Sequence, residues 1–320
     1  MTTNAPRLGA TRLVAAVAAV AALAVLTLTG CAPASSPSGT PSQSSSPTAP
    51  QSSKLELVAS TSVWGNIAQQ VAASHAEVKV ILSNPAQDPH SYEATLRDRL
   101  AVQNADYIVF NGMGYDDFMT KLNTFATAKQ APFEACKRVA VEHCFYQIGV
   151  ANAVATHIAN DLATLDPANR DEYLANAMKL TDQDTELFKL SHGIVAALDN
   201  IEVVETEPLM QPLLGDMGFV DVTPQAFTKA IEEGRDVPVQ TLKQVEDRII
   251  HAKLSFLAVN RQTATAQVNS LVKLCSENGV SVVYFDELLP VGQSYYSWMR
   301  AKILEIRKLT GVDQIGGNNG

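Results

Sequence analysis

Residues 78–93 read VKVILSNPAQDPHSYE, an apolar and β-branched run followed by a polar segment with two prolines. The run at 78–82 is typical of a buried β-strand. The asparagine and prolines of 84–89 prevent a helix or a central strand, so a loop is expected to follow the strand. His90 lies in this loop among carboxylates, and a loop at a strand end is where a rigid scaffold presents a ligand. A solvated loop histidine is the alternative interpretation.

The segments around this stretch alternate between strand and helix patterns. In the first half, strands are expected at 55–60, 78–82 and 107–110, and helices at 64–73, 95–104, 118–125 and 150–165. A second alternation follows residue 200, with strands at 201–206, 219–222, 254–260 and 280–285 and helices at 209–217, 239–252, 265–277 and 295–309. This alternation predicts an α/β fold of two lobes, each a mainly parallel β-sheet flanked by helices. Ligands bind such sheets at the carboxyl ends of the strands.

A long helical pattern connects the two halves of the chain. It begins after a cap at 166–169 and runs from Arg170 to about Leu198. At 1.5 Å per residue, this helix would be on the order of 40 Å long. His192 and Gly193 could interrupt the pattern, so two shorter helices are the alternative.

Length and charge exclude some classes of protein. The chain has 320 residues, of which 46% are hydrophobic, and its net charge is −9. The length is sufficient for a globular protein of two lobes. Because the chain is acidic and has no basic cluster, nucleic acid is not an expected partner.

The first 53 residues have the composition of a lipoprotein leader and a tether. Arg7 and Arg12 precede an uncharged run, 13–28, which is too short for a comfortable membrane span. The run ends in LTGC at 28–31, which resembles a bacterial lipobox and implies that Cys31 is lipidated. A plain cleaved signal peptide is the alternative. Residues 32–53 contain nine serines, five prolines and no charge, so we expect a tether there.

Three cysteines follow Cys31. Cys136 and Cys144 are eight residues apart and could form a local disulfide outside the cytoplasm. Cys275 lies in an apolar helical pattern and is expected to be a buried free thiol.

Four further candidate ligands lie near the ends of predicted elements. His143 is in EHCFYQ at 142–147, shortly before a predicted helix. Glu207 follows the strand at 201–206, and Asp286 and Glu287 follow the strand at 280–285. Each residue alone is commonly a solvated loop residue. The order histidine, histidine, acid, acid, with two residues in each half of the chain, favours a shared metal site.

Several motifs together resemble those of the metal-binding lipoproteins that supply zinc and manganese ABC importers. DPHSYE at 88–93 matches the D-P-H-x-Y-E signature, in which the histidine is the first metal ligand of that family. EHCFYQ at 142–147 partly matches N-P-H-x-W-x-D, because Glu142 and Gln147 replace the proline and the aspartate. Similar segments are also found in TSVW at 61–64, NRQTAT at 260–265 and YYSWM at 295–299.

The resemblance implies that one divalent transition metal ion is bound as cargo between the lobes. The ligands it implies are His90, His143, Glu207 and Glu287, with Asp286 as the alternative to Glu287. Two imidazoles and two carboxylates suit Zn²⁺ or Mn²⁺ better than Mg²⁺ or Ca²⁺. Glu207 in place of a third histidine, and the lack of a histidine-rich loop, favour manganese. The Irving–Williams order nevertheless favours tighter binding of zinc.

The resemblance also implies a partner and a location. The chain would deliver its metal to an ABC transporter permease, as a monomer anchored through Cys31 to the outer face of the bacterial cytoplasmic membrane. An enzyme is not expected, because four protein ligands close the metal shell and no H-E-x-x-H motif is present. The alternative is a surface adhesin or interaction lipoprotein of the same fold, with weak or lost metal binding.

The expected domain organisation follows from these assignments, with the long helix as one rigid link between the lobes. The domains are a leader at 1–31, a tether at 32–53, an N-terminal lobe at 54–165, the linking helix at 166–199, a C-terminal lobe at 200–312 and a flexible tail at 313–320.

Overall fold

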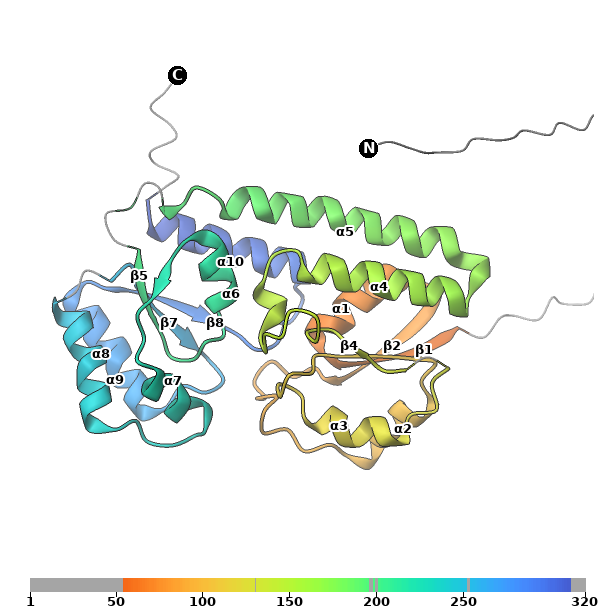
Figure 1. Ribbon diagram of the computed structural model, residues 1–320, viewed down its shortest axis with the longest axis horizontal. Coiled ribbons are helices and arrows are strands. Elements are labelled where there is room, and N and C mark those ends of the chain that lie inside the picture. The colour runs from red at the N-terminus through yellow and green to blue at the C-terminus, as the bar shows by residue number, and fades with distance from the viewer. Residues whose placement is uncertain (1–53, 130, 196–197, 199–200, 252–253, 312–320) are drawn as a thin grey trace, which may run out of the picture. The chain divides into compact units, whose positions relative to one another are not determined.

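The computed structural model describes residues 54–129, 131–195, 198, 201–251 and 254–311 (Figure 1). The predicted leader at 1–31 with its predicted lipidation site Cys31, the predicted tether at 32–53 and the predicted tail at 313–320 lie outside these residues. The described chain contains two parallel β-sheets flanked by helices, so the predicted fold class is confirmed. None of its helices is long and apolar enough to cross a membrane.

The first sheet forms the N-terminal lobe and has the strand order β2-β1-β3-β4, with every pair parallel. Its elements are β1 (Leu55–Thr61), α1 (Ser62–Ala72), β2 (Ala76–Leu82), α2 (Leu96–Asn104), β3 (Tyr107–Phe110), α3 (Phe118–Leu122) and β4 (Phe133–Glu134). Helix α1 forms because Trp64, Ile67 and Val71 recur at helical spacing and are buried. Strand β4 was not predicted, since two residues carry no periodic pattern.

Besides the short 3₁₀-helix η3 (Pro167–Asn169), three elements lead from the first sheet towards the second. They are the short 3₁₀-helix η2 (Cys144–Tyr146), α4 (Val150–Leu165) and α5 (Arg170–Ser191). Helix α5 has 22 residues, which corresponds to about 33 Å. It ends at Ser191, so the expected helix to Leu198 was too long. The physical reason is local: Gly193 has a positive φ of 77°, and the His192 ring nitrogen Nδ1 lies 2.7 Å from the Phe188 carbonyl oxygen.

The second sheet forms the C-terminal lobe and has the strand order β6-β5-β7-β8, again with parallel pairs only. Its elements are β5 (Glu202–Glu205), α6 (Gln211–Met217), β6 (Val220–Asp221), α7 (Gln225–Glu232), α8 (Val239–His251), β7 (Phe256–Asn260), α9 (Ala266–Asn278), β8 (Ser281–Phe285) and α10 (Tyr295–Leu309). Helix α7 was not predicted. Its buried residues Phe227, Ala230 and Ile231 do follow helical spacing.

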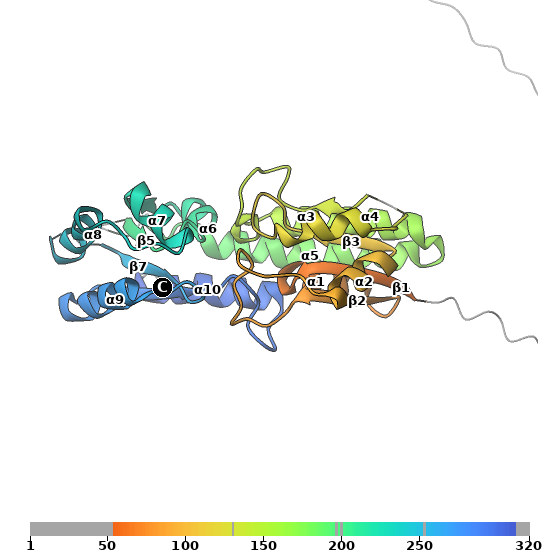
Figure 2. The same cartoon turned by 90° about the horizontal axis from the view of Figure 1, so that it is seen from below.

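The last helix connects the two halves of the fold. Although α10 follows the last strand of the second sheet, it packs against α5 and α1 (Figures 1 and 2). Ser294 caps its N-terminus by accepting a hydrogen bond from the Ser297 backbone N–H. The chain between β8 and α10 must therefore cross from the second sheet to the N-terminal lobe.

Candidate metal centre

The predicted ligands lie on loops that begin at the carboxyl ends of strands, as expected for parallel sheets. His90 lies on the loop after β2, Glu207 follows β5, and Asp286 and Glu287 follow β8. His143 directly precedes the 3₁₀-helix η2. The His90 backbone N–H donates to Asp88 Oδ1 at 2.9 Å, an Asx turn that fixes the start of the DPH segment.

Three of the predicted ligands converge. One ligand atom each from His90, His143 and Glu287 can be chosen so that all three lie within 4.8 Å of one another. His143 Nε2 lies 3.4 Å from Glu287 Oε2, and their side chains are only 4% and 0% exposed. Neither of these two atoms has a hydrogen-bond partner in the described chain. A buried ion pair in which neither atom bonds to any other group is costly to keep out of water, so these two atoms are suited to a cation that both could bind.

The charges of His143 and Glu287 compensate each other. Burial lowers the pKa of the His143 imidazole, but the Glu287 carboxylate raises it, and the net shift is upward from 6.5. Burial raises the pKa of the Glu287 carboxyl, whereas His143 lowers it, and the net shift is downward. Without cargo, a proton on His143 therefore stabilises the Glu287 charge. A bound dication would replace that proton.

Glu207, the fourth predicted ligand, does not belong to the group of three converging ligands in the described chain, but it is linked to Glu287 through one residue, Asn260. The Asn260 side-chain amide, at the end of β7, donates both to Glu207 Oε2 and to Glu287 Oε1, the latter at 2.7 Å. Burial and the nearby Glu287 carboxylate raise the pKa of Glu207 to about 7. Asn260 thus holds two carboxylates side by side that would otherwise repel each other.

Asp286, the alternative to Glu287, is directed elsewhere. Its Oδ1 atom lies 3.2 Å from Arg261 Nε, and this pairing leaves the Asp286 side chain 13% exposed. Within the described chain, Asp286 does not belong to the group of three converging ligands. The geometry therefore favours Glu287.

Two neighbours of the histidines were not predicted as site residues. Glu142 Oε1 lies 3.4 Å from His90 Nδ1. The Tyr115 ring packs edge-on against both His90 and His143, with ring centroids 5.4 and 5.5 Å apart. Glu142 could have been noted from its position beside His143, whereas nothing local to Tyr115 indicates this role.

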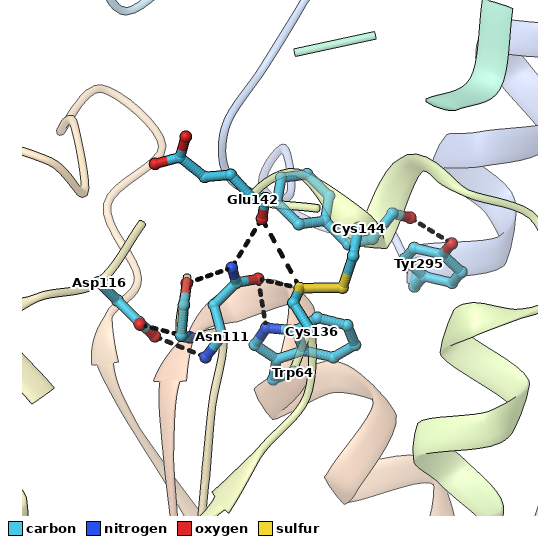
Figure 3. The surroundings of a disulfide bond; sticks show 9 residues. Trp64, Asn111, Asp116, Cys136, Glu142, Cys144 and Tyr295 are labelled. Atoms are coloured by element: carbon cyan, nitrogen blue, oxygen red, sulfur yellow. Dashed lines mark hydrogen bonds between the residues drawn. A yellow bond between two sulfur atoms is a disulfide. The ribbon is translucent and has the colours of Figure 1, made fainter. Parts of the chain in front are cut away.

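A disulfide and an asparagine hold the His143 segment on both sides (Figure 3). Cys136 and Cys144 form the disulfide, while Cys275 is a buried free thiol. The Asn111 side-chain amide donates to the Glu142 carbonyl oxygen at 2.8 Å. His143 is therefore fixed through the residues immediately before and after it, which favours a preorganised ligand.

Asn111 is in turn fixed by two buried groups (Figure 3). Trp64 Nε1 donates to Asn111 Oδ1 at 3.0 Å. The Asp116 carboxylate accepts the backbone N–H groups of Asn111 and Gly112 at 2.7 and 2.8 Å. The hydrogen bonds that fix the His143 segment thus continue through Asn111 to the buried residues Trp64 and Asp116.

Comparison with known proteins identifies the family. The family model described as "Zinc-uptake complex component A periplasmic" matches residues 57–309, which is most of the chain. The chain belongs to this family. The residues that match the family model include every predicted ligand and all but the first two residues of the two sheets.

Relatives and solved structures agree with this assignment. The chain is 25% identical over 295 residues to the manganese ABC transporter substrate-binding lipoprotein PsaA of Streptococcus pneumoniae, covering 84% of this chain and 91% of that protein. It is similar to a mutant laminin-binding adhesin, Lmb, of Streptococcus agalactiae, with a TM-score of 0.68, 17% identity and coverage of 80% and 99%. It is also similar to a Mn-bound S38A mutant periplasmic metal-binding protein of Candidatus Liberibacter asiaticus, with a TM-score of 0.65, 19% identity and coverage of 80% and 99%.

These relationships support the general class of function. The two structural similarities show the fold alone, because both identities are low. The family is described as a zinc-uptake component, and PsaA is named as the substrate-binding lipoprotein of a manganese ABC transporter. The chain is therefore a substrate-binding protein of this family and not an enzyme.

Proposed function

We propose that this chain captures a divalent transition metal ion between its lobes and delivers it to an ABC importer permease. The observation that carries the proposal is the buried ion pair between His143 Nε2 and Glu287 Oε2, which lie 3.4 Å apart and have no other partner in the described chain. His90 lies beside them, at the accessible side of the same group. In the described chain these two buried atoms have only each other as partners, so a metal ion that both could bind would replace their ion pair.

Each of the four ligands has a distinct role in this proposal. His90 is the most accessible, with 31% of its side chain exposed, and would contact the arriving ion first. His143 and Glu287 bind it in the buried part of the site. Glu207 completes the shell, held by the same Asn260 amide that bonds to Glu287. Two neutral imidazoles and two carboxylates leave a bound dication with no net charge.

The proposed cargo is Zn²⁺ or Mn²⁺. The nitrogen and oxygen donor set suits both ions. Manganese is supported by the name of the relative PsaA and by Glu207 in place of a third histidine. Zinc is supported by the family description and by the Irving–Williams order.

Delivery follows from the proposed organisation of the chain. We infer a lipid anchor on Cys31 and a tether at 32–53, which would hold the lobes, 54–165 and 200–312, at the outer face of the cytoplasmic membrane as a monomer. Residues 166–199 would link the lobes and allow small movements only. The permease would release the ion by separating ligands of one lobe from those of the other.

Metal titration tests the capture step. The full-length lipoprotein, purified in detergent and stripped of metal, is titrated with Zn²⁺ and Mn²⁺ beside His143→Ala and the control His157→Ala. We expect one ion per chain, with His143→Ala weakening binding by about a hundredfold or more if four ligands share the roughly 12 kcal/mol typical of a zinc site. His157 is a half-exposed histidine on α4 that pairs with Asp161, so its removal should leave affinity unchanged. A wild type that binds neither ion would refute the proposal.

Metal uptake tests the delivery step. Cells lacking the chain should accumulate less of the bound metal, and the wild type but not His143→Ala should restore accumulation. If the protein binds metal but cells that lack the protein accumulate as much metal as before, the proposed delivery step is wrong. An interaction lipoprotein of the same fold would then be the better explanation.

A further inference from the structure

The loop from Asp286 to Leu289 belongs to the C-terminal lobe by sequence, but it is bound to the N-terminal lobe. The Tyr115 hydroxyl donates to the Glu287 carbonyl oxygen at 2.7 Å, across 172 residues of sequence. The Tyr146 hydroxyl donates to the Asp286 carbonyl oxygen at 2.8 Å. Both tyrosines are fully buried, so water does not compete for these bonds.

Apolar packing reinforces the same attachment. Leu288 is fully buried in a core cluster that it shares with Val58, Ile81 and Ile108 of the first sheet. The Leu289 backbone N–H donates to Ser62 Oγ at 3.0 Å, at the start of α1. The residue after Glu287 is therefore part of the N-terminal core, and the loop cannot leave that lobe without exposing it.

Glu207 is held differently. Its carboxylate bonds to Asn260, which lies at the end of β7 in the C-terminal lobe. The same Asn260 amide also bonds to the Glu287 side chain, and the Glu287 backbone N–H donates to Gln262 Oε1 at 3.3 Å, so Glu287 has bonds to both lobes. Asn260 is itself fixed by its own lobe, since its backbone N–H donates to Thr206 Oγ1 at 3.0 Å. In the described part of the chain, no hydrogen bond joins the Glu207 side chain to the N-terminal lobe.

We propose that Tyr115 and Tyr146 are positioning residues that attach Glu287 to the N-terminal lobe, dividing the four ligands three to one rather than two to two. This inference rests on the proposed function. His90, His143 and Glu287 then form a preassembled site that captures the ion. Glu207 is the one ligand that the C-terminal lobe can supply and withdraw, so release begins with loss of Glu207.

The test removes only the two hydroxyl groups. In the full-length lipoprotein, Tyr115→Phe/Tyr146→Phe leaves two buried carbonyl oxygens without these donors and frees the loop to move. Zn²⁺ and Mn²⁺ affinities, measured by competition with a chelating dye, should fall by about ten- to a hundredfold, as for other residues that orient a metal ligand. The control Tyr107→Phe alters an equally buried tyrosine of the same lobe. Its affinity should stay within about twofold of the wild type.

A double-mutant cycle distinguishes positioning of Glu287 from general destabilisation. In a Glu207→Gln background, Tyr115→Phe/Tyr146→Phe should reduce the affinity by the same factor as in the wild type. In a Glu287→Gln background it should hardly change the affinity, because the ligand that the tyrosines position is already lost. Equal losses in both backgrounds would overturn the inference. If the wild type binds neither metal, the proposed function and the inference both fail. If the wild type binds metal and Tyr115→Phe/Tyr146→Phe binds it equally well, the inference alone fails.

Hydrogen exchange of the metal-free protein gives a second, independent readout. The Leu289 amide, which donates to Ser62, should exchange faster in the tyrosine pair than in the wild type or in Tyr107→Phe. Unchanged exchange at this amide would show that the two hydroxyl groups do not hold the loop, and the inference would fail.

Discussion

Replacing Asn260 with alanine should weaken metal binding although Asn260 is not itself a proposed ligand. Asn260 is 2% exposed, and its side-chain amide donates to one oxygen of Glu207 and one of Glu287. These bonds orient the second oxygen of each carboxylate and reduce the repulsion between them. The alanine variant would remove both bonds at once.

The magnitude follows from the number and type of bonds lost. Removing a residue that orients metal ligands typically reduces affinity by about ten- to a hundredfold, equivalent to about 1.4–2.8 kcal/mol. Asn260 also lowers the pKa of Glu207, which burial and Glu287 raise to about 7. Without the amide, Glu207 should hold its proton more tightly. The affinity loss should therefore be larger at pH 7 than at pH 9.

The assay is competition against a chelating dye at both pH values, with Asn176→Ala as a matched control. Asn176 is also buried, and its amide donates to the Val71 carbonyl oxygen at 3.1 Å, outside the metal centre. The control should lose stability but keep its affinity for metal. Wild-type affinity in Asn260→Ala, or an equal loss in Asn176→Ala, would refute the reasoning that one amide organises both carboxylates.

Three further predictions concern the ligands, pH and the disulfide. Glu287→Ala should reduce the metal affinity by about a hundredfold, whereas Asp286→Ala should change it by about threefold or less. A larger loss in Asp286→Ala than in Glu287→Ala, measured by dye competition, would contradict this assignment. Because the pKa of His143 is raised and that of Glu207 is about 7, protons compete with metal as pH falls. Affinity at pH 6 should be at least about tenfold below that at pH 8, and a flat profile would be inconsistent with these ligands. Reducing the Cys136–Cys144 disulfide should lower the free energy of unfolding by about 2–3 kcal/mol in denaturant melts; an unchanged midpoint would contradict this.

The periodic parts of the fold could be predicted from the sequence. The strand at 107–110 and the helices at 150–165 and 295–309 have the expected limits, because the strand is a continuous apolar run and the apolar residues of both helices recur at helical spacing. The end of α5 was misplaced, because the apolar pattern continues past Gly193 while the backbone turns there. Helix α7 was missed although Pro224 and Gly234 bracket it, and β4 is too short to have a pattern.

The candidate site was only partly predictable. His90 could be selected because DPHSYE matches the family motif, and Glu207 and Glu287 because the family resemblance implies acidic ligands after strands in the second half of the chain. Parallel strands bring such positions to one edge of a sheet. Asn260 also ends a strand, but its bridging role depends on the packing of β5, β7 and β8 against one another. The bond from Tyr115 to the Glu287 carbonyl joins residues 172 positions apart, so no local pattern could reveal it.

The measurement that tests the metal centre most directly is X-ray absorption at the metal edge of the protein loaded with one equivalent of Zn²⁺. The proposed ligands predict two imidazole nitrogens at about 2.0–2.1 Å with carboxylate oxygens completing the shell. His143→Ala should lose one of the two imidazoles. A spectrum without imidazole scattering, or one that His143→Ala leaves unchanged, would contradict the proposed site.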